Sequence, residues 1–161
     1  MTADRPMPKH TILFLAANPI GGQQRALDRE ARAIHAELQS SGHRDSFDFV
    51  TRWAVAPLDL LRELRGLRPT VVHFSGLAAV PRALDGRSLS RDAGCAGVTQ
   101  QRGLHFRDAD GRAQFVSSQA LQETFGAAGA SVQLVVLQGC YCEVQASALL
   151  VHVDCVVEPP A

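Results

Sequence analysis

The stretch "TVVHFSG", Thr70 to Gly76, reads as a buried strand and decides the fold class. It is an apolar run that contains one histidine, His73, and that ends in a small polar residue and a glycine. Two other runs resemble it, "TILFLAA" at 11–17 and "VQLVVLQG" at 132–139. Continuous apolar runs of this length predict strands that are buried on both faces, as in parallel sheets covered by helices.

Helical patterns alternate with these strands. Apolar residues recur at helical spacing in four segments, at 18–42, 57–67, 117–129 and 143–153. "FDFVTRWAV" at 47–55 and "DCVVE" at 154–158 predict further strands, and Asp110-Gly111 between two short strand-like runs predicts a β-hairpin. The alternation predicts an α/β fold with a mostly parallel central sheet, covered on both faces, and an inserted hairpin.

The chain has 161 residues, 46% of them hydrophobic, and a formal net charge of +0. We expect residues 1–10 to be a disordered lead-in and residues 11–161 to form a single domain, with an irregular segment at 77–102. A balanced charge gives no reason to expect nucleic acid as a partner, and no apolar run is long enough to span a membrane. The sequence indicates no cofactor.

Cys140 is the candidate for chemistry, because it follows the most apolar strand, in "VVLQGCYCE". Parallel sheets bind ligands at the carboxyl ends of their strands, and Gly139 leaves room for close approach. The competing interpretation is an inert, buried thiol. Cys142 is too close to Cys140 for an unstrained disulfide, and two thiols alone are a poor metal site. Cys155 is expected in the core, and Cys95 in the irregular segment.

The cysteines show no disulfide framework, which favours a reduced, cytoplasmic setting. A histidine inside a strand, such as His73, is more often a hydrogen-bonded core residue than a catalyst. "NPIGG" at 18–22 could form a phosphate-binding turn before a helix, but it matches neither of the common nucleotide-binding patterns. Nucleotide binding is therefore the least favoured hypothesis.

Five segments follow one another as in the CHAT domain, a bacterial domain similar to caspases. They are "ILFLAANP", "LDREARAIHAEL", "RWAVAPLDLLRELRGLRPTVVHFSG", "GLHFRDADGRAQFVSSQAL" and "LVVLQGCYCEVQASALLVHVDCVV". The resemblance implies a caspase-like three-layer α/β/α sandwich. It also implies a cysteine endopeptidase in which a thiolate attacks the peptide, an imidazole handles the proton and backbone N–H groups hold the oxyanion.

The resemblance makes Cys140 the nucleophile, His73 a structural residue near the site, and Gly76 and Gly139 the candidates for oxyanion-binding backbone. Family members carry a strand ending H-F-S-G-H-G, so the base should follow Gly76, where this chain has Leu77. Leucine cannot accept a proton. His73 lies four residues earlier, which displaces it by about 13 Å along a strand. His105 is the nearest downstream imidazole, and the segment 77–102 replaces a short connection.

Family members also continue beyond the point where this chain ends in "VEPPA". We therefore expect a CHAT-type domain that keeps Cys140 but lacks its base, so that peptidase activity is small or absent and no metal or cofactor takes part. The alternative is a protein-interaction or regulatory module of bacterial signalling built on the same scaffold. Both hypotheses expect a protein or peptide as the partner, in the cytoplasm.

Overall fold

The computed structural model describes residues 9–16, 24–53, 56–75, 103–107, 113–138 and 143–158. They form an α/β fold around a five-stranded sheet in the order β2-β1-β3-β6-β7, in which every neighbouring pair is parallel. A separate antiparallel pair, β4 and β5, forms the inserted hairpin. The strands are β1 His10–Ala16, β2 Phe47–Trp53, β3 Val71–Ser75, β4 Gly103–Arg107, β5 Ala113–Ser117, β6 Leu134–Gln138 and β7 Cys155–Val157.

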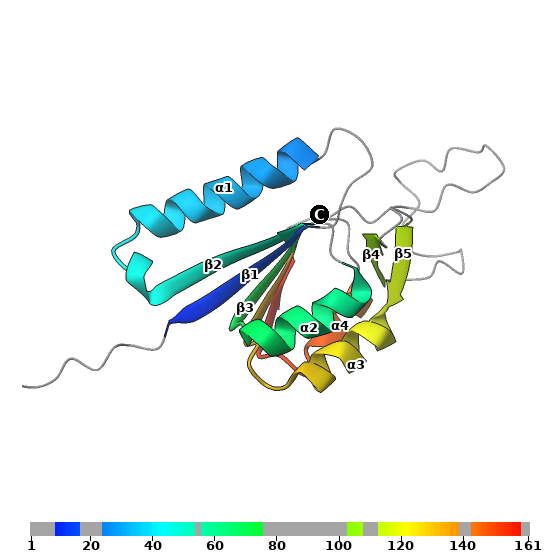
Figure 1. Cartoon of the computed structure of the whole chain (residues 1–161). Coiled ribbons are helices and arrows are strands. Elements are labelled where there is room, and N and C mark those ends of the chain that lie inside the picture. The colour runs from blue at the N-terminus through cyan, green and yellow to red at the C-terminus, as the bar shows by residue number, and fades with distance from the viewer. Residues whose placement is uncertain are drawn as a thin grey trace, which may run out of the picture.

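Helices cover both faces of the sheet, so the predicted three-layer α/β/α arrangement is confirmed (Figure 1). Helix α1 lies alone on one face, and α2, α3 and α4 lie together on the other. The helices are α1 Gln24–Ser40, α2 Pro57–Leu67, α3 Ser118–Ala128 and α4 Glu143–Leu149, with a short 3₁₀ turn at Arg44–Ser46. No helix in the described ranges combines the length and apolar character that crossing a bilayer requires.

Local sequence explains where several helices begin and end. Pro57 opens α2, where its missing N–H would have no intrahelical partner in any case. Ser117 caps α3, because its hydroxyl accepts a hydrogen bond from the Ala120 amide at 3.1 Å. Arg68 ends α2 in the left-handed conformation, with φ 47°, and its amide donates to the Leu64 carbonyl.

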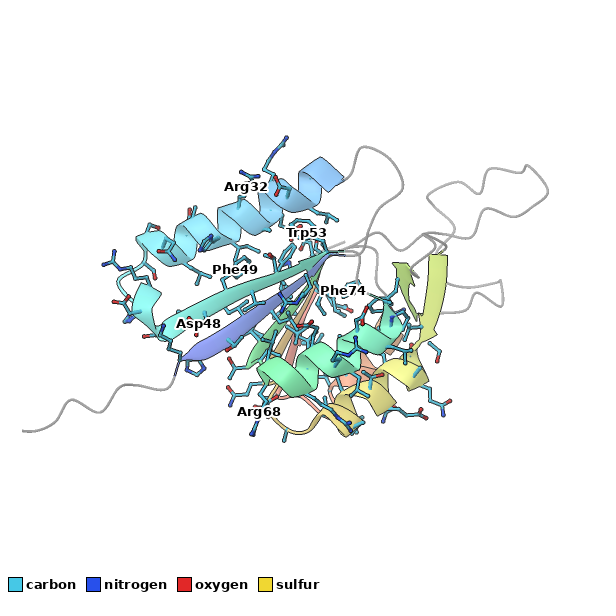
Figure 2. The ribbon with its side chains drawn as sticks, viewed as in Figure 1. Arg32, Asp48, Phe49, Trp53, Arg68 and Phe74 are labelled. Atoms are coloured by element: carbon cyan, nitrogen blue, oxygen red, sulfur yellow. The ribbon has the colours of Figure 1, made fainter. Side chains whose placement is uncertain are left out.

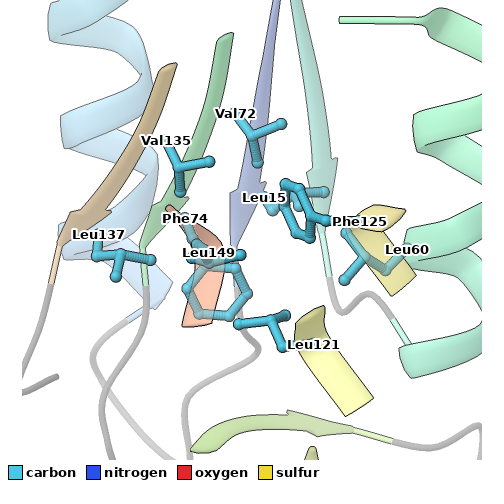
Figure 3. A pocket seen from close by; sticks show the side chains of 9 residues that line it. All are labelled: Leu15, Leu60, Val72, Phe74, Leu121, Phe125, Val135, Leu137 and Leu149. Carbon is cyan, nitrogen blue, oxygen red and sulfur yellow. The ribbon is translucent and has the colours of Figure 1, made fainter. Parts of the chain in front are cut away.

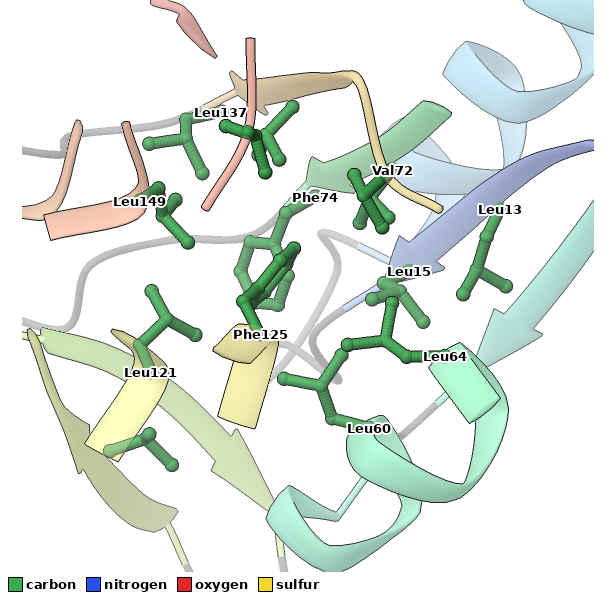
Figure 4. Close-up of a cluster of buried hydrophobic side chains, with 14 of the residues drawn as sticks. Leu13, Leu15, Leu60, Leu64, Val72, Phe74, Leu121, Phe125, Leu137 and Leu149 are labelled. Carbon is green, nitrogen blue, oxygen red and sulfur yellow. The ribbon is translucent and has the colours of Figure 1, made fainter. Parts of the chain in front are cut away.

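Strand β1 shows how the two layers of core arise. Its side chains alternate, so that Leu13 and Leu15 join the large apolar cluster under α2, α3 and α4 (Figure 4), whereas Phe14 and Ala16 pack beneath α1. All four are essentially inaccessible to solvent. This double burial explains why the strand reads as a continuous apolar run rather than an alternating one.

The hairpin of β4 and β5 is attached to the core through a buried side chain from each of its strands. Phe106 is buried, and its ring meets that of Phe74 on β3 edge-on, with centroids 5.4 Å apart. Val116 of β5 is buried in the same cluster. The insertion is therefore packed against the strand that precedes it in the sequence, close to where that strand ends.

The structure differs from the sequence-based predictions in two places near the end of the chain. The fourth helix ends at Leu149 rather than at 153, because the amides of His152 and Val153 both turn back to the Leu149 carbonyl. This turn buries Val153 and directs the chain into β7. The expectation of a core Cys155 was wrong: it is exposed, since it points away from the large apolar cluster that its neighbour Val156 joins.

Candidate functional site

The carboxyl ends of β1, β3 and β6 lie side by side along one edge of the sheet. From β1 the chain runs outward to β2 and then crosses back to place β3 on the other side of β1, so strand order reverses between β1 and β3. Ligands of open α/β sheets bind at such an edge, near the reversal. This edge is therefore where a site is expected on grounds of topology alone.

Strands β3 and β6 are adjacent and parallel, and their last residues, Ser75 and Gln138, are directly paired. Gly76 follows β3 and Gly139 follows β6 in the sequence, and the next residues are Leu77 and Cys140. All four lie outside the described residues, as do Cys95 and Cys142. The register nevertheless brings the strands that lead to Leu77 and Cys140 to the same edge, each two positions before the residue in question.

The described residues at this edge include a polar cluster that joins α1 to β3. His73 Nε2 lies 2.8 Å from Glu30 Oε1, and the Ser75 hydroxyl donates to Glu30 Oε2 at 2.6 Å. A carboxylate only accepts hydrogen bonds, so the His73 nitrogen that faces it carries the proton. One carboxylate thus binds two side chains of the same strand, which are two residues apart and on the same face.

The environment of the cluster favours a structural role for it. The His73 ring stacks on Phe14 with centroids 5.0 Å apart, and only 13% of its side chain is exposed. Ser75 is 2% exposed, and its proton is held by Glu30, so its hydroxyl is unsuited to attack a substrate. His73 is likewise engaged, because its Nε2 is hydrogen-bonded to Glu30.

Sequence reasoning missed Glu30, which reads as one charge among many on a solvated helix. Its position did carry a signal, since it lies on the buried side of α1 between Leu27, Ala31 and Ile34, which pack onto the sheet. A carboxylate at helical spacing among apolar residues needs a polar partner below it. His73 and Ser75, which lie on the same face of β3, are the polar partners of Glu30.

Two further histidines with described side chains make packing contacts elsewhere in the fold. His35 stacks on Phe49 and contacts Gln39, and His152 packs over Gly126. His105 pairs with Phe115 across the hairpin, but its side chain lies outside the described residues. No three His, Cys, Asp or Glu side chains in the described ranges are grouped as metal ligands would be.

A small cavity lies in the core between the sheet and the three-helix layer (Figure 3). Its volume is about 10 Å³ and its walls are entirely apolar. The lining side chains are Leu15, Leu60, Val72, Phe74, Leu121, Phe125, Val135, Leu137 and Leu149. A space this small without polar partners suits neither water nor a substrate, so it is a packing defect rather than a binding site.

"NPIGG", the candidate phosphate-binding turn, falls at 18–22, outside the described residues, and α1 begins two residues later at Gln24. No protein-family model matches the chain, and no curated protein matches it either. The resemblance to CHAT domains therefore rests on the quoted motifs alone.

Proposed function

We propose that this chain is a CHAT-type, caspase-like domain that keeps the nucleophile position, Cys140, and has lost the base, whose position Leu77 occupies. One observation carries most of the proposal: β3 and β6 are neighbouring parallel strands whose paired ends lead to these two residues. Nucleophile and base of a cysteine peptidase must come within hydrogen-bond reach of each other. Adjacent strand ends in register are the arrangement that such a pair requires.

The loss of the base has a definite chemical consequence. Attack by a thiolate needs a group that removes the thiol proton and later protonates the leaving amine. Leucine does neither, and His73 is held by Glu30 about 13 Å back along the strand. Because nucleophile and base act as a unit, removing one removes most of the catalysis. Backbone N–H groups at Gly76 and Gly139 would still be able to bind an oxyanion, but without a reaction to assist.

The test is labelling by a peptidyl probe with a thiol-reactive group, followed by peptide mapping. The background is the Cys155→Ser chain, because Cys155 is an exposed free thiol that would react on its own. We expect Cys140 to be labelled slowly, at a rate that His105→Ala leaves unchanged. Rapid labelling that depends on pH and is abolished by His105→Ala would overturn the proposal, because it would show a replacement base.

The alternative is a protein-interaction or regulatory module on the same scaffold, and exposed apolar side chains favour it. Leu58 on α2 is 84% exposed and Val151, after α4, is 63% exposed. Binding of a protein partner that survives Cys140→Ser but is weakened by Leu58→Asp would support this function. Under either proposal the chain acts in the bacterial cytoplasm on a protein or peptide.

A further inference from the structure

Strand β2 is the outermost strand of the sheet on the α1 side, and its outer edge has no strand partner in the described part of the chain. It is seven residues long, Phe47–Trp53, whereas the strand at the opposite edge, β7, has only three. Short edge strands resist pairing with other chains, and long ones invite it. Acidic residues, Asp154 and Glu158, also flank β7. The two edges of the sheet therefore differ in how strongly they are protected.

The register of the sheet tells which backbone groups of β2 face outward. The Thr70 amide donates to the Thr11 carbonyl. The backbone N–H and C=O groups of the odd residues of β1 therefore point toward β3, and those of the even residues point toward β2. In a parallel ladder with this register, the even residues of β2 then face β1, which leaves the odd residues to present their N–H and C=O groups at the edge. The Arg52 guanidinium donates to the Thr51 carbonyl at 3.1 Å, as expected if that carbonyl is not used inside the sheet.

The sequence of β2, "FDFVTRW", is complementary to itself when it is reversed about Val50. Antiparallel pairing of two copies about this residue puts Asp48 of one copy opposite Arg52 of the other, and the reverse. It pairs Phe49 with Thr51 and Phe47 with Trp53, which are all odd residues with outward backbone groups. Each of these odd pairs can exchange two N–H···O bonds, and the even pairs then take the closer side-chain spacing.

The side chains fit this pairing on both faces of the strand. Asp48 and Arg52 keep about half of their side-chain surface exposed, 53% and 40%, although each has a partner within its own chain, Lys9 and Glu63. Trp53 is 41% exposed at the end of the strand, and Figure 2 shows Asp48 and Trp53 toward opposite ends of β2. Opposite charges and aromatic residues placed across strands both stabilise antiparallel pairs.

We propose that β2 is a self-association surface, at which a second copy of this chain pairs antiparallel about a two-fold axis at Val50. The two five-stranded sheets then form one continuous sheet. A two-fold contact requires a self-complementary surface, and the Asp48/Arg52 arrangement supplies it. The net charge of +0 leaves no long-range repulsion between copies. This inference is independent of Cys140 and of any peptidase function.

The experiment is the molar mass of the full chain in solution, measured by sedimentation over a range of protein concentrations. We expect the mass to rise from 17.3 kDa toward twice that value as the concentration increases. Asp48→Lys places two like charges opposite each other and should abolish the dimer. The control is Asp45→Lys, which changes the net charge equally but lies in the 3₁₀ turn before the strand, and it should leave the dimer unchanged.

Mixing two variants with complementary charges distinguishes a loss of β2 pairing from a general loss of structure. Arg52→Glu should also be monomeric, since it faces Asp48 of the other copy. Mixing Asp48→Lys with Arg52→Glu restores both opposite-charge pairs, so we expect the mixture to form a heterodimer that neither variant forms alone. A wild-type chain that stays monomeric at all concentrations, or a dimer that Asp48→Lys leaves intact, would overturn the proposal.

If the loss of the contact with Glu63 prevents Arg52→Glu from folding, a change at the backbone keeps the inference testable. Thr51→Pro removes an outward N–H that the sheet does not use, and proline is tolerated on edge strands. It should abolish the dimer, while Thr51→Val should not. A dimer that persists in Thr51→Pro would place the contact elsewhere on the molecule.

Discussion

The two faces of β3 show how one strand serves two kinds of interior. Val72 and Phe74 point into the layer under α2, α3 and α4, where they join the large cluster of buried hydrocarbon side chains. His73 and Ser75 point to the other face, where Glu30 of α1 binds both. The apolar layer is held by burial, which is insensitive to direction, whereas the polar cluster depends on the hydrogen-bond geometry of three particular side chains. The difference predicts how each face responds to substitution.

The largest effect should come from the apolar face. Phe74→Ala removes a ring that is 3% exposed and that contacts Phe106 edge-on, and it enlarges an existing cavity. We expect the free energy of unfolding to fall by about 3–5 kcal/mol, as measured by urea denaturation. The control is Leu58→Ala on α2, an 84% exposed position, which should change stability by less than about 0.5 kcal/mol.

Substitutions on the polar face of β3 should lower the free energy of unfolding by less than Phe74→Ala does. Their effect should depend more strongly on which functional group replaces the original one. Glu30→Ala leaves the Ser75 hydroxyl and the His73 N–H without their acceptor, and we expect a loss of about 1–3 kcal/mol. Glu30→Gln should retain much of this stability, because an amide can accept from one partner and donate to the other. If Glu30→Ala is no more destabilising than Glu37→Ala at an exposed position of the same helix, the cluster is not a structural element.

A double-mutant cycle sharpens the comparison by isolating the shortest contact of the cluster. Ser75→Ala removes the hydroxyl that donates to Glu30 at 2.6 Å. In the Glu30→Ala background the same change should cost about 1 kcal/mol less, since the hydroxyl then has no acceptor to lose. Additive effects of the two substitutions in urea denaturation would show that the two side chains act independently.

The smallest effect is expected at the end of α2, at the border of the apolar layer. Arg68 adopts φ 47°, a conformation that costs energy for any residue with a Cβ atom. Arg68→Gly should therefore stabilise the chain by about 0.5–1 kcal/mol in the same denaturation assay. Loss of stability on this change would mean that the Arg68 side chain makes a contribution larger than the backbone strain.

Much of the fold could be predicted from sequence, and the exceptions have physical reasons. The strands of 11–17, 70–76 and 132–139 were predictable because burial on both faces demands continuous apolar runs. Cys155 was misplaced because three residues are too few to show which face of a strand is covered. Glu30 was missed because its partners lie 43 and 45 positions away, on another element.

For the candidate site, sequence gave the residue types but not their proximity. The motifs around His73 and Cys140 suggested a nucleophile and a missing base, but nothing in them sets the pairing of Ser75 with Gln138. That register depends on how the whole sheet packs between its helices. The structure supplies it, by placing the ends of the strands that precede residues 77 and 140 next to each other.

Introducing a base at position 77 tests the proposal of a lost base most directly. In the Cys155→Ser background, Leu77→His should raise the rate at which a peptidyl probe labels Cys140 near neutral pH by about tenfold or more, as an added general base does. The control, Leu77→Asn, adds a polar side chain that cannot take up a proton and should leave the rate low. Equal labelling rates in folded Leu77→His and Leu77→Asn chains would contradict the claim that position 77 is where the base was lost.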